Sequence, residues 1–310
     1  MTRRQLFFQV VSRKREDYVP YDFDFCPYLV EGFAKRTGNT NYKDYYDMPL
    51  RFCYVPCKLK IEDNYHFSKF YRNPTDDMTY SEWGIGIRQG SVAHFTQMLH
   101  PMVNFSSVEE ILNYPYPHYD RDYQWDEVPK KVNLLKNKDT VVFASMGATL
   151  FELSWVLRSM EELCIDMIER PEMANALLDK ILDFKLAFVE RYVKAGVDGF
   201  QFGDDVGSQK DMMISPDMWR EFLKPRLKKV IDHAKELNPD VLIEYHSDGN
   251  IQRIIPELIE IGVEILNPVQ PECMDPFKIK ELYGDKLTFR GCIGTQTLMP
   301  FGTSEEVRET

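Results

Sequence analysis

Short apolar runs alternate with longer amphipathic stretches through the second half of this 310-residue chain. The apolar runs are rich in Val, Ile and Phe, which is typical of strands buried in a parallel sheet. The longer stretches repeat apolar residues every three or four positions, as helices do when one face is buried. This alternation predicts repeated β/α units. The predicted strands are Val141–Ser145, Gly199–Gly203, Val241–His246, Val263–Asn267 and Leu287–Arg290.

The stretches between these strands are predicted helices, and some open with a helix-start signal such as Ser215-Pro216. They are Leu150–Ile168, Pro171–Ala195, Pro216–Leu237, Ile251–Ile261 and Pro276–Tyr283. Two earlier apolar runs, Val19–Phe25 and Leu50–Val55, bring the predicted strands to seven. Because a closed (β/α)8 barrel needs one more strand, we expect a TIM-like barrel that lacks its eighth strand.

The last residues, Ser304–Thr310, predict the first turns of a helix capped by Ser304. An eighth strand would normally follow, so residues 1–310 are expected to form a single barrel domain that is incomplete at its C-terminal end. The region from about 58 to 120 departs from the β/α rhythm, since it is rich in aromatic and turn residues. It predicts an antiparallel β-rich insertion. Unpaired strand edges favour association, so we also expect a homodimer.

Composition narrows the class of partner. The net charge of −11 gives no basic surface for nucleic acid or an anionic membrane. No apolar run approaches the roughly 20 residues of a membrane span, and no signal-peptide cleavage site follows the N-terminus. Six cysteines are too dilute for a disulfide framework in a chain of this length. We therefore expect a cytoplasmic protein that acts on a small molecule.

Two potential metal ligands close one predicted strand. His246 and Asp248 stand two residues apart, so their side chains share a face at the carboxyl end of the strand, where α/β proteins bind ligands. His246 could instead hydrogen-bond within the barrel mouth, and Asp248 before Gly249 could shape a turn. Cys292, after the last predicted strand, could reach the same mouth as a further ligand.

Acids and amides follow other predicted strands. Asp204 and Asp205 end one strand, and because adjacent side chains point to opposite sides, one of them should face the mouth while the other is structural. Glu152 is a predicted functional acid, although the first turn of a helix favours an acid in any case. These three are the predicted catalytic residues. The predicted substrate-binding residues are the amides and the arginine that follow later strands, namely Asn267, Gln270, Arg290 and Gln296. Arg290 could clamp a substrate carboxylate or pair with an acid of the barrel.

Several segments together resemble the uroporphyrinogen decarboxylase superfamily, which also contains cobalamin:coenzyme M methyltransferases. The matching segments span nearly the whole chain in one order. They are Glu82-Trp83-Gly84, Phe151–Trp155, Gly203–Gln209, Ile214-Ser215-Pro216, His246–Gly249, Ile265–Pro271 and Pro300–Thr303. The resemblance implies a TIM-like barrel, in agreement with the hydrophobic pattern.

The methyltransferase branch of that superfamily places His-x-Cys at the end of this strand, where the two residues help to bind zinc. His246 matches the histidine, and Asp248 takes the place of the cysteine. The resemblance therefore implies a zinc-dependent methyl transfer between a small acceptor and a corrinoid supplied by a partner protein. Zinc suits this chemistry because it converts a bound thiol to a thiolate, and a carboxylate is an acceptable zinc ligand.

Two other functions remain open. Porphyrinogen decarboxylation in haem biosynthesis would need several arginines and the family's glycine-containing arginine loop near the N-terminus, where this chain has Ser12–Asp17 without a glycine. A catalytically silent member that binds a small ligand or a partner is the third reading. Asp248 in place of cysteine, Gly294 where relatives often carry aspartate, and the missing eighth strand favour it.

Overall fold

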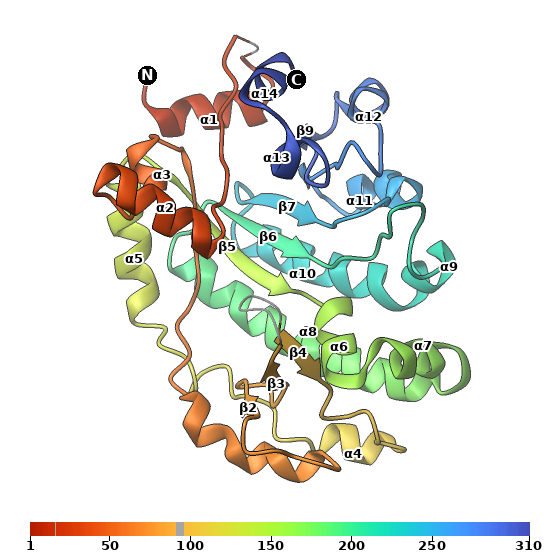
Figure 1. Cartoon of the computed structure of the whole chain (residues 1–310). Helices are drawn as coiled ribbons and strands as arrows, with labels where there is room; N and C mark the ends of the chain where they lie inside the picture. The colour runs from red at the N-terminus through yellow and green to blue at the C-terminus, as the bar shows by residue number, and fades with distance from the viewer. Residues whose placement is uncertain (16, 91–95) are drawn as a thin grey trace.

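The computed structural model describes residues 1–15, 17–90 and 96–310, apart from the side chains of residues 61–63, and centres on a parallel sheet (Figure 1). Within the described residues this sheet has six strands in the order β1-β5-β6-β7-β8-β9, and each neighbouring pair is parallel. The strands are β1 Leu50–Cys53, β5 Val141–Ala148, β6 Gly199–Gly203, β7 Leu242–His246, β8 Ile265–Asn267 and β9 Thr288–Phe289. Spatial order follows chain order, as in a barrel wound from β/α units.

Helices connect and flank these strands. The α-helices are α1 Arg3–Val11, α2 Pro27–Thr37, α3 Tyr42–Tyr45, α4 Val108–Leu112, α5 Glu127–Lys136, α6 Phe151–Arg158, α7 Met160–Glu169, α8 Pro171–Lys194, α9 Pro216–Met218, α10 Lys224–Leu237, α11 Ile255–Glu260, α12 Pro276–Tyr283, α13 Leu298–Phe301 and α14 Ser304–Glu309. Shorter helical segments are the 3-10 helices η1 Ile61–Phe70 and η3 Gln252–Ile254 and the π-helical turn η2 Trp219–Leu223. Among the described residues, no helix combines the length and apolar character needed to cross a bilayer.

A second, antiparallel sheet forms within the predicted insertion. It consists of β2 Thr79–Tyr80, β3 Gly86–Gln89 and β4 Thr96–Leu99. Figure 1 shows this sheet and α4 at the lower end of the molecule, away from α1 and α14. Residues 91–95 of the insertion lie outside the described part of the chain. The parallel α/β architecture and the separate antiparallel sheet confirm the predicted fold class.

Helix α1 closes the N-terminal end of the barrel. Phe7 and Val11 are buried in one apolar cluster with inward-facing strand residues, and the Phe7 and Phe143 rings pack edge to face at 6.3 Å. Gly199 on the neighbouring strand makes room for the Phe143 ring, because a Cβ atom there would lie 2.4 Å from it. Burial of this apolar surface stabilises the strand arrangement that carries the functional groups at the opposite end.

The predicted strand Val19–Phe25 is wrong, because the segment has no regular secondary structure and pairs with no strand in the described part of the chain. Its aromatic side chains pack on α2 and α3 instead: the Phe25 ring lies 4.5 Å from that of Tyr42 and 6.0 Å from that of Phe33. An alternating apolar pattern is equally compatible with an irregular segment that packs on helices.

Among the helix boundaries that differ from the prediction, two have a clear local cause. The predicted helix Leu150–Ile168 is two helices, since Ser159 has φ of 79° and its side chain accepts a hydrogen bond from the main chain of Glu162 to cap α7. At the end of the chain Thr303, not Ser304, caps α14, through a capping box with Glu306. Both corrections depend on single-residue backbone angles, to which hydrophobic periodicity is insensitive.

Candidate metal centre

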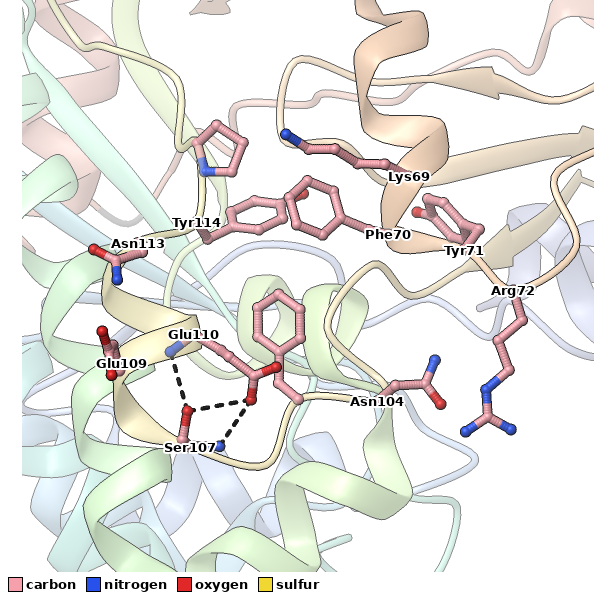
Figure 2. Close-up of a pocket in the computed structure, with 12 residues that line it drawn as sticks. Lys69, Phe70, Tyr71, Arg72, Asn104, Ser107, Glu109, Glu110, Asn113 and Tyr114 are labelled. Carbon is pink, nitrogen blue, oxygen red and sulfur yellow. Dashed lines mark hydrogen bonds between the residues drawn. The ribbon is translucent and has the colours of Figure 1, made fainter.

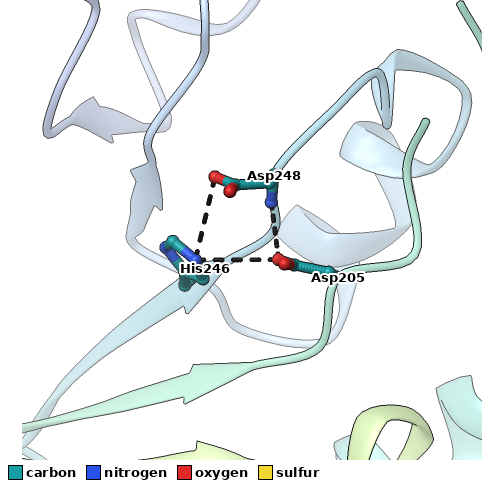
Figure 3. Close-up of side chains that lie close together, drawn as sticks. All are labelled: Asp205, His246 and Asp248. Carbon is teal, nitrogen blue, oxygen red and sulfur yellow. Dashed lines mark hydrogen bonds and ion pairs between the residues drawn. The ribbon is translucent and has the colours of Figure 1, made fainter. Parts of the chain in front are cut away.

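Asp205, His246 and Asp248 converge at the carboxyl ends of β6 and β7 (Figure 3). His246 is the last residue of β7 and pairs in register with Gly203 of β6, which brings the loop carrying Asp205 alongside. His246 Nε2 lies 3.6 Å from Asp205 Oδ1 and 3.9 Å from Asp248 Oδ1. The two loops after these strands therefore place three potential ligand atoms within 4.8 Å of one another.

A close main-chain contact holds the two loops together. The main-chain N–H of Asp248 donates to Asp205 Oδ1 at 2.8 Å. Gly249 has φ of +81°, and a Cβ atom on it would lie 2.5 Å from the main-chain carbon of Gly207. Only glycine accommodates both the positive φ and this approach. The Asp-Gly pair thus shapes a turn and also points a carboxylate at His246.

Asn267, at the end of β8, orients the imidazole. His246 Nδ1 lies 2.5 Å from Asn267 Oδ1, and the Asn267 amide nitrogen donates to the main-chain oxygen of Arg290 at 2.7 Å. With the amide oxygen facing the ring, Nδ1 is the donor, which leaves the Nε2 lone pair of a neutral imidazole directed at the two carboxylates. This arrangement is the outer-shell hydrogen bond expected of a metal-binding histidine.

The donor set fits a divalent cation such as zinc. Two ligands of a tetrahedral zinc, each at about 2.0–2.2 Å, lie roughly 3.3–3.6 Å apart, and the distances from Nε2 come close to that. Burial and the negative charge of Asp205 raise the pKa of Asp248, against the opposing effect of His246. A cation would offset this carboxylate repulsion. The side chains remain 35–52% exposed, so further ligand positions are open to a substrate.

The structure distinguishes the two adjacent acids. Asp205 faces the cluster, whereas Asp204 is buried and accepts hydrogen bonds from the main-chain N–H groups of Leu150 and Glu152, each at 3.0 Å. Asp204 therefore caps the N-terminal turn of α6 from another strand. Burial raises its pKa to about 6 in spite of these hydrogen bonds. Its predicted catalytic role stays a prediction. Its contacts hold the main chain of Glu152 in place.

Glu152 lies next to the cluster as a partly buried acid in the first turn of α6. Burial, followed by the charges of Asp204, Asp205 and Asp248, raises its pKa to about 7, although it accepts a hydrogen bond from the main chain of Asp205. At neutral pH this carboxyl group is therefore divided between its protonated and ionised forms. A group with this pKa can both deliver and accept a proton.

Replacing Glu152 with glutamine in the metal-free protein is expected to raise stability more at pH 8 than at pH 5. An unfolded glutamate ionises near pH 4.3, whereas folded Glu152 ionises near 7. Between these values unfolding releases a proton, so wild-type stability falls as the pH rises. Glutamine has no such dependence. We expect the difference between variant and wild type to grow by about 1–2 kcal/mol, allowing for partial exposure.

Urea unfolding of both proteins at pH 5 and pH 8 with a chelator present measures this difference. Glu110→Gln is the control, since Glu110 belongs to the capping box of α4 and its hydrogen bonds lower its pKa. An equal Glu152→Gln effect at the two pH values would contradict a raised pKa.

Arg290 pairs with an acid of the barrel, which is one of the two alternatives that the sequence allowed. Its Nε and terminal nitrogen donate to the two oxygens of Glu244 at 2.9 and 2.7 Å, and Asp22 lies 3.5 Å away. Glu244 on β7 is fully buried and also accepts from Gln201 at 2.7 Å. This bidentate pair lies one inward position below His246. A role for Arg290 in binding substrate stays a prediction, since its guanidinium is already engaged.

The other predicted site residues lie around this centre in different ways. Gln270 accepts from the main chain of Gly249 at 2.7 Å and donates to Thr295 at 3.1 Å, so it holds the loop of Asp248. Gln296 is exposed, and its main-chain N–H donates to Glu272 at 3.0 Å. Within the part of the chain that is described, Cys292 is not in the converging group.

Cys292 instead lines a cavity of about 800 Å³ between α1, α12 and β9. A further cavity, of about 780 Å³, lies in the insertion between η1 and α4 (Figure 2). Its walls carry the Phe70 and Tyr114 rings, 4.9 Å apart, with Lys69 and Arg72 on one side. It contains none of the predicted site residues. The structure therefore gathers Asp205, His246 and Asp248 with Glu152 and Asn267, and leaves Cys292 and Gln296 apart.

A family model described as uroporphyrinogen decarboxylase (URO-D) matches residues 2–310, nearly the whole chain. The chain belongs to the uroporphyrinogen decarboxylase family. The resemblance predicted from the sequence is thereby confirmed.

Curated relatives within the family carry two activities. The chain is 29% identical over 143 residues to a uroporphyrinogen decarboxylase of Chlorobium luteolum, which covers 46% of this chain and 38% of the relative. It is also 29% identical over 134 residues to the methylcobamide:CoM methyltransferase MtaA of Methanosarcina barkeri, covering 43% and 37%. The matched segments span less than two-fifths of either relative. This member thus belongs to a family of enzymes that includes both decarboxylases and methyltransferases.

A solved structure confirms the fold of this uroporphyrinogen decarboxylase family member. A methyltransferase from Methanosarcina mazei superposes with a TM-score of 0.71 at 16% identity, covering the full length of this chain and 88% of the other. At that identity the comparison concerns the fold alone.

Lys185 is a residue near the site that the sequence did not single out. It occupies a core-facing position of α8, four residues from Ile181 and four from Val189, both of which are buried. A lysine within an apolar helical stripe is the signal that could have found it, because a buried charge needs specific partners.

Proposed function

We propose that this protein transfers a methyl group between a corrinoid, carried by a partner protein, and a small thiol, with zinc held by Asp205, His246 and Asp248. The convergence of these three side chains at the strand ends carries the proposal. The methyltransferase among the relatives and the orientation of His246 by Asn267 support it.

In this proposal some residues of the site bind the metal and another transfers a proton. Asp205, His246 and Asp248 would hold the zinc, and a zinc ion there would lower the pKa of a bound thiol. Asn267 keeps Nε2 of His246 directed at the carboxylates. Glu152, which accepts a hydrogen bond from the main chain of Asp205, lies beside these ligands and can accept the proton that the thiol gives up. As ligands, Asp205 and Asp248 would leave more positive charge on the metal than thiolates, which would favour loss of the thiol proton.

Porphyrinogen decarboxylation is the second candidate, and one observation favours it. Glu152 can deliver a proton at neutral pH, and decarboxylation replaces a carboxylate with hydrogen. Binding of a substrate with many carboxylates would need free arginines, however, and Arg290 at this end of the barrel is committed to Glu244. A metal-ligand cluster also has no use in that reaction. We therefore favour methyl transfer.

The test is metal content followed by a methyl-transfer assay. We expect about one zinc per chain by mass spectrometry. We also expect zinc-dependent demethylation of methylcobalamin by 2-mercaptoethanesulfonate, which is monitored by absorbance. The same preparation is offered uroporphyrinogen. Zinc binding with methyl transfer would support the proposal. Absence of zinc would rule out the proposed site, and porphyrinogen turnover without metal would establish the second candidate.

A further inference from the structure

Lys185 reaches from α8 to the end of β5 as a buried cation. Its Nζ donates to the main-chain oxygens of Met146 and Ala148, both at 2.7 Å, and the residue is only 6% exposed. Burial lowers its pKa to about 8, although the charges of Asp204 and Glu152 oppose that effect. Burying an ammonium group is costly without strong partners. The two hydrogen bonds of Lys185 therefore offset part of this cost.

The two carbonyl groups that Lys185 contacts belong to an irregular strand end. The register between β5 and β6 shifts between Ser145 and Ala148, and Gly147 has φ of +55°. A β-bulge interrupts regular strand pairing. Lys185 supplies hydrogen bonds to these carbonyl groups, and thereby fixes the path of the chain where it leaves the sheet.

Thr149 links this strand end to the metal centre. Its main-chain N–H donates to the Gly203 oxygen at 2.8 Å, and its hydroxyl accepts from the Gly203 N–H at 2.9 Å. The next residue, Leu150, donates its N–H to the Asp204 carboxylate at 3.0 Å. Gly203 and Asp204 are therefore fastened to the end of β5, and Asp205 follows directly.

We propose that Lys185 is a positioning residue of the metal centre, which sets the place of Asp205 by fixing the end of β5 through Thr149 and Asp204. This inference rests on the proposed zinc site. No substrate or metal contact is needed for the role, since Lys185 acts through the main chain.

The charge of Lys185 and its two hydrogen bonds have opposite effects on zinc affinity. The ammonium of Lys185 repels a cation, so removing its charge alone would tighten zinc binding. Loss of the two hydrogen bonds would free the strand end and displace Asp205, which weakens zinc binding. The direction of the change in zinc affinity therefore separates a positioning role from a purely electrostatic one.

Lys185→Met tests the proposal through zinc affinity, measured by competition with a chelating dye at pH 7. We expect affinity to fall by up to about 10-fold, the lower end of the range for residues that hydrogen-bond a metal ligand directly, because Lys185 acts through intervening main chain. Lys180→Met is the matched control, because Lys180 lies on the same helix and is exposed. Zinc affinity that is unchanged or tighter in Lys185→Met would overturn the proposal.

Two variants of Thr149 keep the proposal testable if Lys185→Met does not fold. Thr149→Val removes the hydroxyl but keeps the volume, whereas Thr149→Ser keeps the hydroxyl and removes a methyl group from a fully buried site. Positioning predicts weakened zinc binding in Thr149→Val and near wild-type binding in Thr149→Ser, whatever their melting temperatures. Equal zinc affinity in both would overturn it. Wild-type protein that takes up no zinc would instead refute the proposed function, and with it this inference.

Discussion

Arg290→Met is expected to lower the free energy of unfolding by about 3–5 kcal/mol, because it leaves a buried carboxylate without its counter-ion. Glu244 is fully buried and receives both arginine hydrogen bonds, while Gln201 supplies only one more. Urea unfolding followed by circular dichroism measures the loss. A free substrate-binding arginine would behave differently, since its removal would leave stability almost unchanged.

The double variant Glu244→Gln, Arg290→Met is the control for this interaction. Removing the carboxylate charge as well should recover at least about 1 kcal/mol of the loss, since a neutral amide costs less to bury than an unpaired carboxylate. Gln201 still has an oxygen to contact in the double variant. A double variant as unstable as the sum of the two single variants would contradict a direct coupling between Glu244 and Arg290.

His246→Ala is expected to weaken zinc binding by more than about 100-fold, because it removes the only nitrogen ligand of the converging group. Asp205 and Asp248 alone offer two partly exposed carboxylates. Such pairs are common on protein surfaces that bind no zinc. The measurement is zinc affinity by chelator competition. Asn267→Ala should have a smaller effect of the same sign, since it frees the imidazole to rotate while keeping all three ligands.

His233→Ala is the matched control for that experiment. His233 lies on α10 beside Glu190, with Nε2 at 3.3 Å from the carboxylate, and is not part of the converging group. It should retain wild-type zinc affinity. A parallel loss of zinc in both histidine variants, or none in His246→Ala, would show that zinc binds elsewhere or not at all.

The order of elements followed from the sequence because hydrophobic periodicity depends on which face of each segment is buried. Pro276–Tyr283 is a helix with the predicted bounds, and the pair His246 and Asp248 was placed at the end of its strand correctly. In both cases the determining interactions are local: a cap, a proline at the start, or side chains that alternate along one strand.

Tertiary structure decided what lay beyond those local rules. Sequence placed Val19–Phe25 in the sheet, but contacts with rings from α2 and α3 hold it outside. The choice of Asp205 over Asp204 as the acid that faces His246 depends on where the chain turns after β6, and α6 needs Asp204 as its cap. Adjacent residues on a strand end have no local preference for one face once the strand has ended.

The sequence also did not predict which potential ligands from distant segments meet in the folded chain. It supplied His246 and Asp248 as potential ligands, while Asp205 rather than Cys292 joins them because the loops after neighbouring strands touch at Gly207 and Gly249. By itself the sequence determined the family, the β/α order and the strand end that carries the histidine. Only the folded chain decided which charges meet there, because those pairings depend on strand register and loop contacts between residues far apart in the chain.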